Sequence, residues 1–124
     1  MQVKDYKMVY YNPWDAQYLV VNYSDKDYIK ELNRLKSYNS TEYKGYYGVT
    51  GFDKYDLVAI YADSYQGFVY ALTDNKNKII YVKIIFCNCF ININYNEYIN
   101  NDYLPTGFYA TLNNEYEKVM TKNI

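Results

Sequence analysis

Three short apolar runs separated by polar turn segments constrain the fold of this chain more than any other feature. The runs lie within 56–61, 67–73 and from 78 onward, and the segments 62–66 and 74–77 between them contain Asp, Asn and Ser. Connections this short are typical of consecutive antiparallel strands. Apolar residues occupy adjacent positions in all three runs, so both faces of these strands must be covered along part of their length. Such cover comes either from a sheet that curls on itself or from another subunit.

One segment, 25–38, predicts an amphipathic helix. Tyr28, Ile29, Leu32 and Leu35 are spaced to share one helical face. Ser24 is a suitable N-cap, and acidic residues in the first turn with basic residues in the last turn complement the helix dipole.

The remaining segments resemble strands and turns. The pattern predicts a first hairpin from 6–11 and 17–23 around a turn at 12–15, and a long strand from 78 to 95 with a bend near Asn88. A helical turn over 97–101 and a strand over 107–112 are expected near the C-terminus. We therefore predict a single α+β domain over 1–124, with a curled antiparallel sheet of five to seven strands packed against one amphipathic helix.

The composition favours a binding function over a catalytic one, because the chain has 20 tyrosines and no histidine. Tyrosine combines a large apolar ring with a polar hydroxyl, whereas histidine is the usual proton carrier and metal ligand. Tyr38, Tyr43, Tyr46 and Tyr47 alternate with small and polar residues, a mixture similar to antibody contact loops. We predict that these four tyrosines bind a partner.

Other candidate sites are weaker. Cys87 and Cys89 supply two thiols where structural zinc needs four ligands, so we expect them to be reduced, metal-free and structural, with no cofactor bound. The carboxylates Asp53, Asp56 and Asp63 could serve a small hydrolase. A local group of lysines, Lys76, Lys78 and Lys83, could support single-stranded nucleic acid on a tyrosine platform.

A net charge of −1 argues against nucleic acid as a partner. No apolar run is long enough for a signal peptide or an uninterrupted membrane span. We expect a cytoplasmic, non-enzymatic protein that binds a host or defence-system protein, such as a phage or mobile-element inhibitor of the anti-CRISPR kind or an immunity protein. The alternatives are a single-stranded nucleic-acid or small-ligand binder and a carboxylate-dependent hydrolase. We also predict a homodimer through the apolar segments 57–60 and 79–85.

Overall fold

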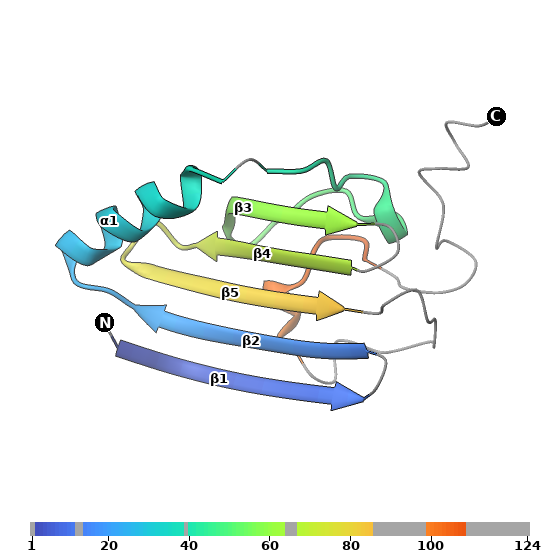
Figure 1. The fold of residues 1–124 in the computed structure, drawn as a ribbon, viewed down its shortest axis with the longest axis horizontal. Helices are drawn as coiled ribbons and strands as arrows, with labels where there is room; N and C mark the ends of the chain where they lie inside the picture. Colours follow the sequence, from blue (N-terminus) through green and yellow to red (C-terminus); the bar gives the residue numbers. More distant parts are fainter. Residues whose placement is uncertain (1, 12–13, 39, 64–66, 86–98, 109–124) are drawn as a thin grey trace.

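The computed structural model describes residues 2–11, 14–38, 40–63, 67–85 and 99–108. It confirms an α+β fold with an open, curled antiparallel sheet and one α-helix (Figure 1). Among the described residues, the sheet has five strands in the order β1-β2-β5-β4-β3. In chain order the elements are β1 (Gln2–Tyr11), β2 (Trp14–Asn22), α1 (Asp25–Lys36), η1 (Tyr46–Gly48), β3 (Asp56–Asp63), β4 (Gly67–Thr73), β5 (Lys78–Ile85) and η3 (Asn101–Tyr103).

Two local units make up the sheet. The hairpin β1-β2 and the meander β3-β4-β5 form from neighbouring segments, as the sequence predicts, and they join where β2 pairs antiparallel with β5. This pairing places β5 at the centre of the sheet and leaves β1 and β3 at its edges (Figure 1).

Some predictions near the C-terminus differ from the structure or lie beyond it. A short 3-10 helix spans Asn101–Tyr103, and the helical turn predicted over 97–101 lies partly outside the described residues. Strand β5 is described as far as Ile85, so the predicted extension to 95, including Cys87 and Cys89, lies outside the described residues, as does most of the strand expected over 107–112.

Helix α1 begins where its cap predicts, because the Ser24 Oγ accepts a hydrogen bond from the Asp27 backbone N–H at 3.2 Å. Tyr28 and Leu35 are buried against the sheet. Ile29 is 60% exposed, so its predicted place on the buried face is wrong. The reason is geometric: one residue along a helix turns the side chain by about 100°, and Ile29 points away from the face that Tyr28 presents.

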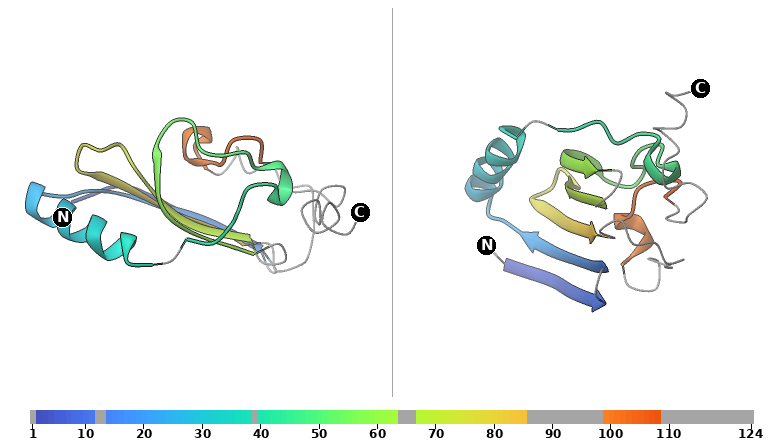
Figure 2. Two further views of the ribbon diagram at one scale, coloured as in Figure 1. Left: turned by 90° about the horizontal axis from the view of Figure 1, so that it is seen from above. Right: turned by 45° about the vertical axis from the view of Figure 1, so that its right-hand side comes forward.

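Segments of the same chain pack on both faces of the sheet, as Figure 2 shows for the helix and the loop segments. Helix α1 packs on one face, where it meets Ala71 and Ile79. Tyr47, Val49, Ile99 and Leu104, which come from the segments before β3 and after β5, pack on the other face with core residues of four strands. The exposed fraction is 0% for both Ile79 and its neighbour Ile80, whose side chains belong to opposite faces.

This arrangement removes part of the surface predicted for a homodimer. Ile79, Ile80 and Ile84 are fully buried inside one chain and are therefore not available to a second copy. The apolar residues at adjacent strand positions are explained by the helix on one face and the loops on the other. Homodimer formation itself stays a prediction.

Candidate functional site

A groove opens on the face of the sheet that carries α1, at the part of that face that the helix leaves uncovered. Its volume is about 510 Å³. All five strands contribute to its lining, together with the C-terminal end of the helix and the residue that follows its cap. The lining residues are Tyr6, Gln17, Tyr18, Leu19, Leu35, Tyr38, Ala59, Ile60, Tyr61, Val69, Tyr70, Ala71, Tyr81, Val82 and Lys83.

Strand register explains why these side chains meet, because residues directly opposite one another in antiparallel strands share a face. One row crosses the sheet through Tyr6, Leu19, Tyr81, Ala71 and Ala59. A second, parallel row is formed by Gln17, Lys83, Val69 and Tyr61. The small side chains of Ala59 and Ala71 lie opposite each other in the first row, and Tyr81 lies opposite Ala71 on its other side.

Exposed apolar side chains are concentrated in this groove. Of the six large hydrophobic residues that the described structure exposes, four line it: Tyr6 at 57%, Tyr38 at 60%, Tyr61 at 51% and Val69 at 42%. Exposed apolar residues scattered singly are ordinary on a protein surface, whereas these four line one hollow. The groove is therefore the best candidate for function.

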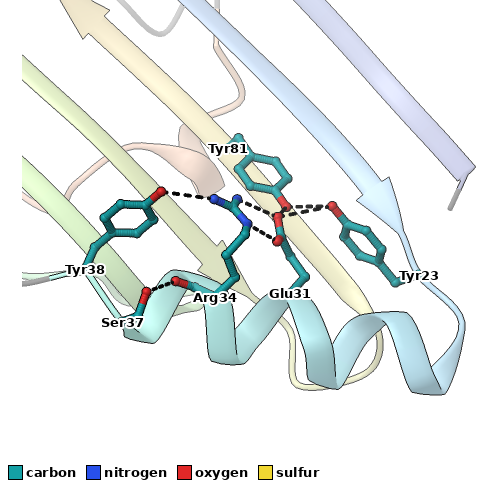
Figure 3. A network of polar contacts seen from close by, with 6 residues as sticks. All are labelled: Tyr23, Glu31, Arg34, Ser37, Tyr38 and Tyr81. Atoms are coloured by element: carbon teal, nitrogen blue, oxygen red, sulfur yellow. Dashed lines mark hydrogen bonds and ion pairs between the residues drawn. The ribbon is translucent and has the colours of Figure 1, made fainter.

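A polar network borders the groove and connects it to the helix (Figure 3). The Glu31 carboxylate accepts hydrogen bonds from the Tyr81 hydroxyl and, at 2.8 Å, from the Arg34 Nη2. The Tyr81 hydroxyl also lies 2.6 Å from that of Tyr23 on the other side. Arg34 in turn donates to the Tyr38 hydroxyl at 3.3 Å. Two tyrosines that line the groove, Tyr38 and Tyr81, are thus held by one ion pair on α1.

Hydrogen bonding and burial set the protonation states of Glu31 and Tyr81 in this network. The hydrogen bond from Arg34 holds the pKa of Glu31 below its ordinary value. Burial, assisted by the hydrogen bond to the Glu31 carboxylate, raises the pKa of Tyr81 far above that of free tyrosine. Tyr81 is therefore a neutral hydrogen-bond donor at physiological pH and is unsuited to act as a base or a nucleophile there.

The four tyrosines predicted to bind a partner do not lie together. Tyr38 is exposed and lines the groove, whereas Tyr43 and Tyr46 are half-buried and pack against the core on the opposite face. Tyr47 is completely buried, with its ring edge-on to Phe68 at 6.1 Å between centroids. The prediction of a surface role for Tyr47 is therefore wrong.

The backbone of the loop explains the burial of Tyr47. Gly45 and Gly48 adopt positive φ angles of 93° and 81°, and Tyr47 itself has a φ of 53° between them. Glycine adopts such angles at little cost, so the loop can turn tightly and direct the Tyr47 ring inward. The glycine and tyrosine content that resembles a contact loop instead serves to cover the core.

The sequence prediction missed Tyr6, Tyr61 and Val69. They lie on three different strands. For Tyr61 and Val69 the available signal was their alternation with buried neighbours. That alternation could not show which sheet face the helix would leave open.

Two of the candidate carboxylates, Asp56 and Asp63, lie far apart. Asp56 and Asp63 begin and end β3, which separates them by about 23 Å at the usual rise of a strand. The Asp56 carboxylate accepts a hydrogen bond from the Asn75 side chain at 2.6 Å. Asp53 lines a second hollow, of about 410 Å³, with Lys54 and Asp102. Within the described part of the chain no three His, Cys, Asp or Glu residues are grouped so that they could hold a metal ion.

The lysines near the β4-β5 turn are also dispersed. Lys76 is in the turn, the Lys78 Nζ lies 5.2 Å from the centre of the Tyr55 ring, and Lys83 lines the groove. Lys78 and Lys83 are five positions apart on β5, so their side chains leave opposite faces of the sheet.

No protein-family model matches this chain, and neither the curated proteins nor the solved structures contain a match. Among the described residues, no helix combines the length and the apolar character that crossing a membrane requires.

Proposed function

We propose that this chain is a small protein-binding module and that the tyrosine-lined groove beside α1 is its contact surface. The observation that carries the proposal is the concentration of Tyr6, Tyr38, Tyr61 and Val69, all exposed, in one hollow. Large aromatic side chains at the centre of an interface typically supply most of its binding energy. We further propose that the bound partner is a host or defence-system protein, which this chain would inhibit or neutralise as an inhibitor or an immunity protein.

Several features favour binding over catalysis at this groove. Lys83 is the one charged residue among the described residues that line it, and Tyr81 is fixed as a neutral donor by Glu31. The groove therefore brings together no acid and base with suitable pKa values. Its rim is instead held in position by the Glu31–Arg34 pair, and such preorganisation lowers the entropic cost of association.

A small apolar molecule is the second candidate occupant, because a volume of about 510 Å³ lies within the range of small-molecule pockets. Native mass spectrometry of the purified protein distinguishes the two occupants. A retained small molecule that is lost from a Val69→Ser variant would favour the small-ligand alternative. Single-stranded nucleic acid is a poorer match, because one lysine does not make the cationic track that a phosphate backbone requires.

Site-specific crosslinking in cells that produce the protein tests the main proposal. A photoreactive phenylalanine derivative at position 61 should crosslink a defined partner, and the same group at position 29 should not. Position 29 is a matched control, since Ile29 is 60% exposed but lies outside the groove.

Binding of the crosslinked partner is then measured with purified variants. Tyr61→Ser and Val69→Ser should each weaken affinity at least about fivefold, which corresponds to about 1 kcal/mol. Ile29→Ser should leave the affinity unchanged. Equal crosslinking at positions 29 and 61, or equal affinities for all variants, would refute the groove as the contact surface.

A further inference from the structure

We infer that the groove recognises a peptide segment that presents an apolar side chain next to a carboxylate, and that Lys83 selects the carboxylate. This inference rests on the proposed function and specifies the chemistry of the partner.

Lys83 lies in the second row of groove residues, with Gln17, Val69 and Tyr61. It is directly opposite Gln17 on β2 and Val69 on β4, and neither neighbour carries a charge. The ion pair that borders the groove is complete in itself, because Arg34 is bound to Glu31. Among the described residues, the structure records no ion pair for the Lys83 ammonium group.

A partner that covers the groove removes water from around Lys83. Burying an ammonium group without a compensating charge is costly, and an unpaired charge in an interface opposes binding. A partner carboxylate placed against Lys83 offsets this cost, whereas a neutral or basic group does not. The groove thus discriminates among apolar segments by the charge next to the apolar side chain.

The spacing of the two groups follows from strand register. Val69 is directly opposite Lys83, so their Cβ atoms are about 5 Å apart. An apolar side chain that packs on Val69 and Tyr61 is therefore close to a carboxylate that reaches Lys83. In the bound peptide, the apolar residue and the acidic residue are therefore two positions apart if the segment is extended, or three to four positions apart if it is helical.

Selection from a displayed library of random dodecapeptides on the immobilised full-length protein provides the probe. Enriched peptides should carry Asp or Glu at one of these spacings from an aromatic or aliphatic residue. Each is synthesised with a fluorescent label, and its affinity is measured by anisotropy for the wild type, Lys83→Gln, Tyr61→Ser and the control Lys76→Gln. Lys76 is an exposed lysine of the β4-β5 turn, outside the groove.

Lys83→Gln should weaken binding roughly fivefold, as expected for a partly exposed ion pair, and Lys76→Gln should have no effect. Replacing the peptide carboxylate with its amide should remove the difference between the wild type and Lys83→Gln. Raising the salt concentration should lower the affinity of the acidic peptide more than that of the amide peptide.

The outcomes separate this inference from the proposed function. Peptides that depend on Tyr61 but lack an acidic residue, or that bind Lys83→Gln as tightly as the wild type, overturn the inference and leave the groove as a contact surface. A selection that yields no peptides, or only peptides that depend on neither Tyr61 nor Lys83, overturns both.

Discussion

Replacing Glu31 with glutamine tests whether the network in Figure 3 stabilises the fold and holds the rim of the groove. The Glu31 side chain is only 14% exposed and accepts well-formed hydrogen bonds from Tyr81 and Arg34. Glutamine keeps the shape but removes the charge and directs an amide N–H₂ toward hydrogen-bond donors. A hydrogen bond to a charged acceptor is worth about 1 kcal/mol more than a neutral one. Arg34 is 52% exposed, so solvent screening weakens its interaction with Glu31. We therefore expect Glu31→Gln to lower the free energy of unfolding by about 1 to 2 kcal/mol.

The pH dependence gives this prediction a second test. The pKa of Glu31 is lowered in the folded protein from its ordinary value of 4.5, so folding favours the carboxylate. Its contribution to stability is therefore fully present above pH 4.5 and is lost as the pH falls through the lower pKa of the folded state. The difference in stability between the wild type and Glu31→Gln should be largest near neutral pH and should shrink in acid.

Urea unfolding followed by circular dichroism measures both effects, provided that the slope with denaturant is unchanged. Asp53→Asn is the control, because Asp53 is exposed and the same change of group there should alter stability by less than about 0.5 kcal/mol. Equal stability of the wild type and Glu31→Gln at pH 7 would contradict the argument. So would a difference that persists undiminished in acid.

Two further predictions concern backbone and core. Gly67→Ala should destabilise the protein by at least about 2 kcal/mol, because the added Cβ would lie 2.0 Å from the Ile84 carbonyl oxygen at a φ of +121°. Gly51→Ala, where nothing lies within 4 Å of the added Cβ, is the matched control, and equal melting temperatures for the two variants would show that Gly67 is not required. Tyr47→Ala should cost about 3 to 5 kcal/mol in thermal or urea unfolding, as expected for a fully buried aromatic ring. If Tyr47→Ala instead weakened partner binding and left the melting temperature unchanged, Tyr47 would be a contact residue and its structural role would be refuted.

The sequence by itself determined those features that depend on nearby residues. Ser24 and the residues of the first turn fix where α1 begins, since a cap acts over three or four positions. The polar turn segments likewise locate β4 at the predicted bounds and β3 within two residues of its predicted end. Adjacent apolar residues in the strands also indicated correctly that both sheet faces are covered.

The tertiary structure decided which side chains remain exposed. Tyr38 and Tyr47 belong to the same tyrosine-containing stretch after the helix. One is 60% exposed and the other is completely buried, because of the two only Tyr47 packs on the core of the sheet. Tyr6 and Tyr61 are far apart in sequence and lie on the two edge strands, and they line one groove only because β2 pairs with β5. Hydrogen bonding and capping act over short stretches of chain, whereas the exposure of a side chain depends on what distant segments place against it.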